Sequence, residues 1–265
     1  MTALPYWHVD AFADRLFTGN QAAVMVLDDW LEDSVLQAIG QENNFAETAF
    51  VVRDASGEAD WALRWFTPTT EIRLCGHATL ASGHVLLSRD GGKSVTFRTR
   101  EAGILEVCRS GDAYEIGLPA IRTRPHDAAQ AVAALGDTPD EIERNEDGYT
   151  VYRFASEEQV RALAPDFRAL EALGDDLHVV TARGGETDIV SRAFAPAHGI
   201  DEDPVTGGAH AMLTPFWAER LERQTFTAYQ ASARGGRLTC HLEGDRVWLG
   251  GACVTVVEGQ FSLPG

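Results

Sequence analysis

The sequence has few basic residues for its length. Its 265 residues include 22 Lys and Arg against 40 Asp and Glu, which gives a formal charge of −18. A protein that binds nucleic acid or an anionic membrane needs a basic surface for the phosphates, so neither is expected as a partner. A small anionic substrate is still compatible with this charge, because backbone dipoles at a helix start can hold it.

Cysteines and long apolar runs are also scarce. The four cysteines are scattered, without a Cys-x-x-Cys pair or metal-finger spacing, which disfavours a disulfide framework and favours a reducing compartment. No stretch approaches the roughly 18 apolar residues of a membrane span, and the first residues do not join a basic segment to an apolar run. We therefore expect a cytoplasmic protein.

Several common catalytic motifs are missing. The sequence contains no Gly-x-x-x-x-Gly-Lys-Ser/Thr loop, no Gly-x-Gly-x-x-Gly after a strand, no His-Glu-x-x-His and no Gly-x-Ser-x-Gly. The sequence therefore lacks the motifs that usually indicate nucleotide binding, nicotinamide binding, zinc-dependent catalysis or serine-hydrolase chemistry. No cofactor or metal is expected. With 45% hydrophobic residues the chain is globular, as one large domain or two of about 130 residues.

The two halves of the sequence repeat the same order of segments. Arg64–Pro68 precedes Cys75–Ala78 and an apolar helical stretch to Leu87, just as Arg192–Pro196 precedes Thr206–Ala209 and an apolar stretch to Trp217. A Gly-Asp pair between two alternating apolar runs follows in each half, at residues 111–112 and 244–245, and predicts a tight hairpin. Three segments in the same order favour duplication over chance.

The predicted architecture is a duplicated α+β fold. Residues 1–120 form one half and residues 121–265 the other, with a proline-containing crossover over 118–125 and the active site in the cleft between them. Strands and helices mix without strict βαβ alternation. The predicted strands are residues 6–12, 22–27, 48–52, 61–66, 95–99, 151–154, 178–181 and 189–194. An amphipathic helix is predicted at 31–41, and surface helices are predicted at 156–163 and 166–173. Ser156 is predicted to cap the first of these surface helices.

Glycines mark the start of both apolar helices. Gly76 with His77, and Gly207 with Gly208, stand where free backbone N–H groups are left uncovered by side chains. Two such helix starts facing one cavity would bind a carboxylate. The alternative is that these glycines only allow close packing of helix on sheet.

Acidic side chains and histidines supply further candidates. Glu47 precedes an apolar strand, where a shielded carboxyl can take and return a proton; the alternative is a solvated Glu in a turn. His77 is expected on an exposed first turn, whereas His84 and His210 lie deeper in their helices and are expected in the core. The acidic cluster 201–203 has two alternatives to a role in the site. Acids favour a helix start, and a divalent-metal site is disfavoured because no other close-set group of carboxylates and histidines accompanies the cluster.

Six segments together resemble the PhzF family of phenazine biosynthesis-like isomerases, in order and over nearly the whole chain. They are Asp10-Ala11-Phe12 with Phe17-Thr18-Gly19-Asn20, Asn44-Phe45-Ala46-Glu47-Thr48, Arg64-Trp65-Phe66-Thr67-Pro68, Cys75-Gly76-His77-Ala78-Thr79 and Asp201-Glu202-Asp203-Pro204-Val205-Thr206-Gly207. The resemblance implies the diaminopimelate epimerase-like fold, two similar halves that each roll a small sheet around a central helix. It also suggests a homodimer.

The resemblance assigns roles to some of these residues. It implies that Glu47 is the catalytic acid and base, that His77 and Asp203 contact the substrate, and that Gly76 with Gly207 forms the backbone anion site. The chain departs from the family pattern at Gly208, where the phenazine enzymes are expected to carry Ser, and at Gln21, where Pro is usual.

The related racemases of this fold are similar but use one cysteine at each helix start. Here the first position is Cys75, whereas the equivalent second position is Thr206, whose hydroxyl is far too weak an acid to replace a thiolate. A single-base proton shift is therefore preferred.

The sequence leads to one principal hypothesis and two alternatives. The principal one is a cofactor-independent isomerase of a small carboxylate-bearing metabolite, in which Glu47 moves the proton. The alternatives are a non-catalytic metabolite-binding protein on the same fold, and an epimerase or racemase that uses Cys75 with another base.

Overall fold

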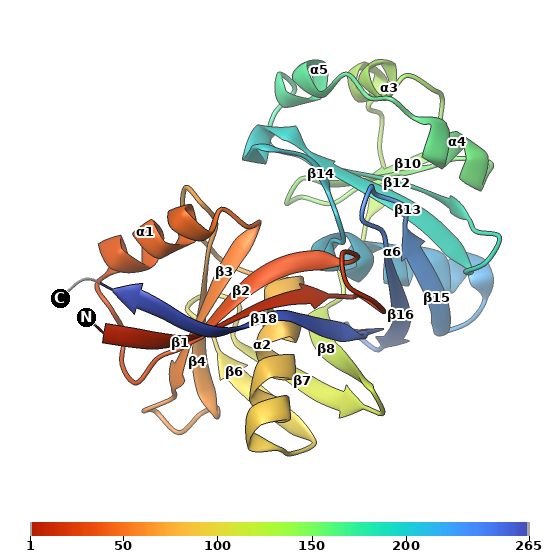
Figure 1. Ribbon diagram of the computed structural model, residues 1–265. Coiled ribbons are helices and arrows are strands. Elements are labelled where there is room, and N and C mark those ends of the chain that lie inside the picture. The colour runs from red at the N-terminus through yellow and green to blue at the C-terminus, as the bar shows by residue number, and fades with distance from the viewer. Residues whose placement is uncertain (1, 264–265) are drawn as a thin grey trace. The chain divides into compact units, whose positions relative to one another are not determined.

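The computed structural model describes residues 2–263, which divide into two compact units. The first unit ends at Leu118 but also includes the residues from Gly250 onward, whereas the second runs from Pro119 to Leu249. The sequence predicted one continuous second half, 121–265. The difference arises because β18 (Cys253–Leu263) pairs antiparallel along β1 (Thr2–Ala11), so the two strands lie side by side in Figure 1.

The first unit is built on one mixed sheet with the strand order β18-β1-β2-β3-β4-β6-β7-β8. The short strand β5 (Glu71–Ile72) adds to β4. The bounds of the others are β2 Asn20–Val26, β3 Glu47–Arg53, β4 Trp61–Phe66, β6 Ser94–Arg98, β7 Ile104–Ser110 and β8 Ala113–Pro119.

The second unit repeats this pattern of pairing. From β10 through β11, β12, β13 and β15 to β16, the alternation of parallel and antiparallel neighbours is the same as from β1 through β2, β3, β4 and β6 to β7. The bounds are β9 Arg124–Pro125, β10 Glu141–Arg144, β11 Tyr149–Arg153, β12 Leu177–Arg183, β13 Ile189–Ala195, β14 Ile200–Asp203, β15 Thr225–Gln230, β16 Gly236–Glu243 and β17 Arg246–Gly251.

Each unit holds one long, largely buried helix. These are α2 (Gly76–Asp90) and α6 (Gly207–Leu221), each of 15 residues and a little longer than the sequence predicted. In Figure 1 the strands of the first unit surround α2. At Gly83 the helix approaches β7 so closely that a Cβ atom would lie 2.4 Å from Val107 Cγ1, which is why only glycine fits there.

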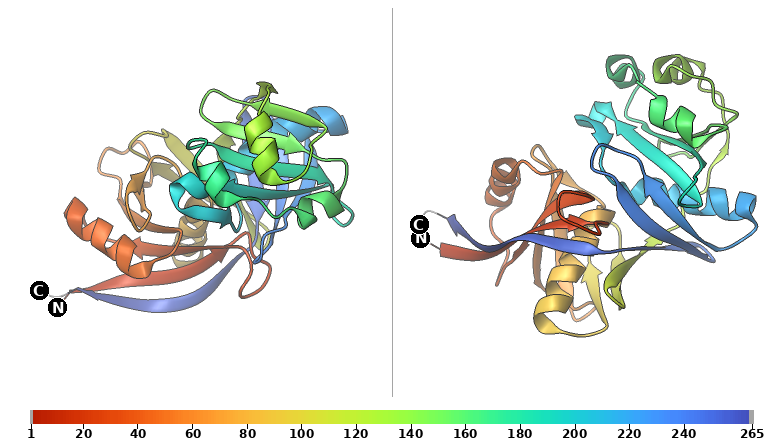
Figure 2. Two further views of the ribbon diagram at one scale, coloured as in Figure 1. Left: turned by 90° about the horizontal axis from the view of Figure 1, so that it is seen from above. Right: turned by 45° about the vertical axis from the view of Figure 1, so that its right-hand side comes forward.

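The remaining helices are short and lie outside the sheets. Their bounds are α1 Asp33–Asn43, α3 Ala129–Leu135, α4 Glu157–Ala162, α5 Phe167–Glu171 and the 3₁₀ turn η1 Pro196–His198. In the second unit, α3, α4 and α5 cover one face of the strands (Figure 2) and pack Leu135, Val160 and Leu170 against buried Phe154 and Phe194. The predicted N-cap is confirmed, since the Ser156 hydroxyl accepts from the backbone of Gln159.

The duplication extends to a partly buried ion pair that was not predicted from the sequence. Arg64 on β4 donates two hydrogen bonds of 2.8 Å to Glu71, and the equivalent Arg192 on β13 donates two, of 2.8 and 3.0 Å, to Glu202. Each carboxylate belongs to the short strand that follows. Glu202 of the predicted acidic cluster therefore ties β14 to β13.

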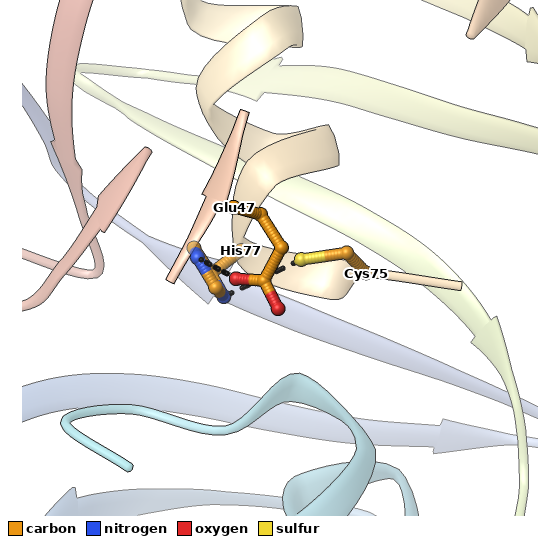
Figure 3. A group of neighbouring side chains, drawn as sticks. All are labelled: Glu47, Cys75 and His77. Atoms are coloured by element: carbon orange, nitrogen blue, oxygen red, sulfur yellow. Dashed lines mark hydrogen bonds and ion pairs between the residues drawn. The ribbon is translucent and has the colours of Figure 1, made fainter. Parts of the chain in front are cut away.

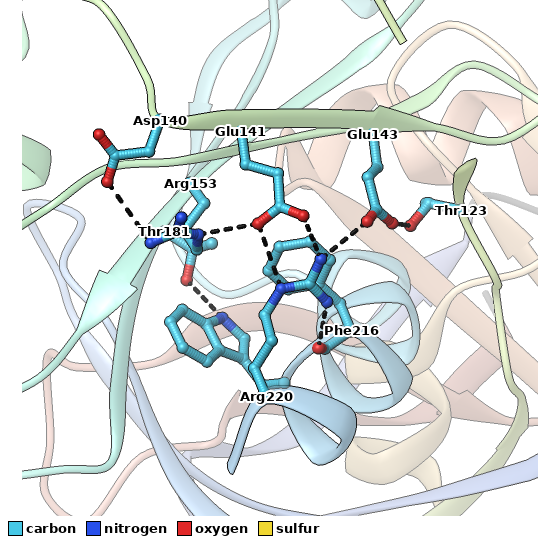
Figure 4. A network of polar contacts seen from close by, with 9 residues as sticks. Thr123, Asp140, Glu141, Glu143, Arg153, Thr181, Phe216 and Arg220 are labelled. Atoms are coloured by element: carbon cyan, nitrogen blue, oxygen red, sulfur yellow. Dashed lines mark hydrogen bonds and ion pairs between the residues drawn. The ribbon is translucent and has the colours of Figure 1, made fainter. Parts of the chain in front are cut away.

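A second polar network anchors α6 inside its unit. Arg220 pairs with Glu141 and Glu143 on β10, and Glu141 also accepts from Arg153 (Figure 4). The Arg220 guanidinium also lies 3.4 Å from the centre of the Phe216 ring. Within residues 2–263, no helix is both long enough and apolar enough to cross a membrane.

Candidate active site

Glu47 is the first residue of β3 and is largely shielded from water. Helix α1 ends at Asn43, and the left-handed backbone of its C-cap Asn44 (φ 51°) turns the chain towards β3. Strand β3 then runs parallel to β2, with Glu47 opposite Ala22. Only 8% of the Glu47 surface is exposed. The alternative of a solvated glutamate in a turn therefore does not hold.

Two side chains from the start of α2 converge on this carboxyl group (Figure 3). His77 Nε2 lies 3.0 Å from Glu47 Oε2, and His77 Nδ1 lies 3.5 Å from the sulfur of Cys75. The amide nitrogen of Asn20, on β2, lies 3.2 Å from the same Nδ1. Glu47, Cys75, His77 and Asn20 therefore form one cluster drawn from β2, β3 and α2.

The prediction that His77 is exposed is wrong. The residue is only 5% exposed, because strands β2 and β3 pack against the first turns of α2. No role was predicted for Asn20 from the sequence, although Asn20 lies in one of the segments that carry the family resemblance.

Burial controls the charges in this cluster. Burial, reinforced by the Glu47 carboxylate, raises the pKa of the Cys75 thiol to about 11. Burial opposes a charged His77, but the neighbouring sulfur and carboxylate outweigh it, so the His77 pKa lies well above its usual 6.5. The Cys75 thiol therefore keeps its proton at neutral pH.

Gln21, which stands where the family pattern usually has proline, makes a contact that proline could not make. The Gln21 side-chain nitrogen lies 3.1 Å from His8 Nε2, across the β1–β2 pair. The His8 ring in turn stacks on Phe45, with ring centres 4.3 Å apart, two residues before Glu47. Gln21 thus orients a ring beside the segment that leads to Glu47.

In the second unit, Asp203 is held by the residues that begin α6. The Thr206 hydroxyl donates to Asp203 Oδ2 at 2.5 Å, and the Thr206 backbone N–H donates to Gln230 Oε1 at 2.9 Å. Gln230 also donates to the Asp203 carbonyl at 2.7 Å. Gln230 is fully buried. Its role at the start of α6 was not predicted from the sequence, because a single glutamine in an alternating strand gives no signal of such a role.

Gly207 and Gly208 are the first two residues of α6. A Cβ atom at Gly208 would lie 3.0 Å from both Cε1 and the hydroxyl oxygen of Tyr149. A serine at this position would therefore require the Tyr149 ring to shift by a few tenths of an ångström.

Both glycine turns leave their first backbone N–H groups without a side-chain cap. Neither Cys75, the N-cap of α2, nor Thr206, the N-cap of α6, makes a capping hydrogen bond. Uncapped N–H groups at a helix start favour an anion. In the first unit the structure brings together Glu47 and the turn of Gly76 and His77, and in the second it brings together Asp203 and the turn of Gly207 and Gly208.

His210 is the buried, backbone-bonded histidine that the sequence predicted. Its Nδ1 lies 2.9 Å from the Thr206 carbonyl and the residue is fully buried, and this burial lowers its pKa to about 4. The unfolded chain takes up a proton near pH 6.5, before the native state does. We therefore expect the free energy of unfolding to fall from pH 6.5 towards pH 4, with His210 contributing about 3 kcal/mol.

Urea unfolding of the wild type and His210→Gln across this pH range measures that contribution. The variant should be less stable at pH 7 but should lose less stability on acidification. Parallel pH curves for the two proteins would contradict the assignment.

Comparison with known proteins identifies the family and the fold of the chain. A family model described as phenazine biosynthesis-like protein matches residues 9–259. An uncharacterized isomerase of Pseudomonas aeruginosa is 48% identical, over 98% of this chain and 99% of its own length. The crystal structure of a PhzF family protein from Enterococcus faecalis has a TM-score of 0.93 at 42% identity and covers 99% of this chain and 100% of its own.

A more distant structure extends the fold comparison. A hydroxyproline epimerase from Agrobacterium vitis has a TM-score of 0.67 at 13% identity, covering 97% of this chain and 92% of its own. This likeness is one of fold. The predicted α+β, epimerase-like fold is thus confirmed.

Proposed function

The chain belongs to the phenazine biosynthesis-like (PhzF) family and is an isomerase of that family, and from this premise we propose that it shifts a proton on a small carboxylate-bearing metabolite, with Glu47 as the single acid and base. The observation that carries this proposal is the shielded Glu47 carboxyl, 3.0 Å from His77. One carboxyl group can remove a proton from carbon and return it to a neighbouring position, so the reaction needs no cofactor.

The surrounding residues have complementary roles in this proposal. The uncapped N–H groups at Gly76 and Gly207 bind the substrate carboxylate or the enolate-like charge that develops when the proton leaves. Gly208 continues the second of these turns. His77 and Asp203 position polar groups of the substrate, and Asp203 is itself fixed by the Thr206 hydroxyl.

Two features argue against racemisation by paired thiols. Thr206 occupies the position of the second thiol, and its hydroxyl donates to Asp203. The remaining thiol, Cys75, keeps its proton at neutral pH because burial raises its pKa to about 11. A single base on one face of the substrate accounts for both features. We further propose that the protein acts in the cytoplasm as a homodimer.

A screen of small carboxylic acids for thermal stabilisation is the first experiment, because a ligand selective for the native state stabilises it by about 2.7 kcal/mol at one hundred times its Kd. Each hit is then incubated in heavy water with the wild type and Cys75→Ser. We expect both proteins to isomerise the substrate at rates within a few-fold of each other and to incorporate deuterium.

Two outcomes would overturn the proposal. Loss of activity in folded Cys75→Ser, with activity retained in Glu47→Gln, would favour the epimerase that uses Cys75. A tightly bound ligand that stays chemically unchanged and exchanges no proton over a long incubation would favour the non-catalytic binding protein.

A further inference from the structure

Trp65, on β4, carries a buried hydrogen-bond donor without an acceptor. The residue is 2% exposed, and among residues 2–263 no atom accepts from its indole nitrogen, Nε1. An indole N–H can only donate, so it requires an acceptor atom. Buried polar groups in native proteins are nearly always hydrogen-bonded, and each exception calls for an explanation. The missing acceptor therefore has to come from water or from a bound molecule.

Trp65 shares one face of the sheet with Glu47. In the antiparallel pair β3–β4, Trp65 is directly opposite Ala49, and residues opposite each other point to the same face. Glu47 precedes Ala49 by two positions on β3, so it points to that face as well. Such diagonal neighbours are about 7–8 Å apart, within reach of long and aromatic side chains. This is the face on which Glu47 meets His77 (Figure 3).

The opposite face of these strands packs against α1. Phe66 follows Trp65 along β4 and lies, with Phe50 of β3, in one hydrophobic cluster with Leu36 of α1. Because successive side chains of a strand alternate between the two faces, Trp65 and Glu47 point away from α1. The indole of Trp65 is therefore on the face of the candidate active site rather than in the α1 cluster.

Open space borders Trp65. The residue lines a cavity of about 140 Å³ together with Leu63 of β4 and Ile72 of β5. The cavity lies where β4 changes its neighbour, because β6 pairs with residues 61–62 and β5 pairs with residues 65–66. This volume exceeds what a single water molecule needs. A polar group of a bound molecule therefore has room beside Trp65.

Most of the other residues that line this cavity are charged. Arg73 and Arg100 border it, and each is paired with a glutamate that also lines it, Glu101 and Glu71 respectively. A hydrocarbon chain would desolvate these charges without pairing with them, so an oxygen-bearing group suits the cavity better. Arginine side chains in particular are suited to carboxylates.

We propose that Trp65 is a further substrate-binding residue, whose indole N–H donates a hydrogen bond to an oxygen atom of the metabolite. In the proposed function the first carboxylate is held by backbone N–H groups, so this oxygen belongs to a second group, and a second carboxylate fits the cavity. The inference rests on the proposed function, because it takes Glu47 to mark the substrate site. It narrows the substrate class to small dicarboxylates.

The indole N–H signals in the NMR spectrum of isotope-labelled protein test this contact. The six tryptophans give six signals, and that of Trp65 is assigned from its contacts with Ala49 in the wild type and confirmed by its loss in Trp65→Phe. The probes are succinate and glutarate, with butyrate and pentanoate as monocarboxylates of the same carbon number. Saturating dicarboxylate should move the Trp65 signal downfield, as a newly hydrogen-bonded proton does. A Trp65 signal that stays in place, or dicarboxylates that do not bind, would overturn the proposal.

Trp65→Phe removes the N–H group and keeps an aromatic ring. This variant should bind the dicarboxylates at least about tenfold more weakly, the effect of losing one hydrogen bond to a charged group, and the monocarboxylates as the wild type does. The matched control is Trp61→Phe, the same change at another buried tryptophan of β4, which should bind all the probes like the wild type. Equal affinities of the wild type and Trp65→Phe for the dicarboxylates would contradict the proposal. Failure of the Glu47 base would appear separately, as undiminished turnover by Glu47→Gln with a Trp65 signal that still responds.

Discussion

Glu47→Gln should lower kcat by about 10²–10⁴-fold, the range that one positioned acid–base group contributes. Glutamine keeps the size of the side chain and can still accept from His77, but it cannot take a proton from carbon. Because the substrate is held mainly by backbone N–H groups in this account, KM should change little. The measurement is the steady-state turnover of the substrate found by the carboxylate screen, determined from the amount of product formed over time.

The matched control is Glu42→Gln, which makes the same chemical change at an exposed position of α1, one residue before that helix ends. This control should keep wild-type turnover. If Glu47→Gln retained more than about one tenth of the wild-type kcat, a group other than Glu47 would have to move the proton.

His77→Asn should lower kcat by about 10²-fold while Glu47 remains in place. The imidazole fills the space between Glu47 and Cys75 and contacts the carboxyl at 3.0 Å, so its loss lets the base leave its reacting position. A displacement of about 1 Å at a reacting group can cost this much. The raised pKa of His77 also predicts an ionisation above pH 6.5 in the pH–rate profile.

That ionisation distinguishes a role in the chemistry from a role in folding. It should be absent from the profile of His77→Asn and present in that of His126→Asn, a change at an exposed histidine of the second unit. A His77→Asn protein with reduced turnover but an unchanged pH profile would show that the imidazole acts only by packing.

The duplication could be read from the sequence because each copy keeps residues that the backbone requires. Gly111 and Gly244 both adopt positive φ, 62° and 61°, in the hairpins that the Gly-Asp pairs predicted. The two buried helices could likewise be predicted from their apolar stretches and the glycines before them. Local patterns of this kind survive divergence because few other residues fit the same backbone.

Long-range pairings could not be predicted from the sequence. The return of β18 to β1 joins the two ends of the chain, and nothing in either strand identifies the other. The burial of His77 depends on β2 and β3 covering the start of α2, and the Arg64–Glu71 and Arg192–Glu202 pairs depend on the short strands β5 and β14. Each of these features is a consequence of tertiary contacts, which periodicity does not encode.

The single-base proposal is tested most directly by following one labelled proton. The substrate is synthesised with deuterium at the carbon that loses its proton and is converted by the wild type in ordinary water, and the product is examined by NMR after less than one turnover. If Glu47 both removes and returns the proton, a measurable fraction of the deuterium appears at the new position in the product. Complete loss of the deuterium to solvent within the first turnover would contradict the account.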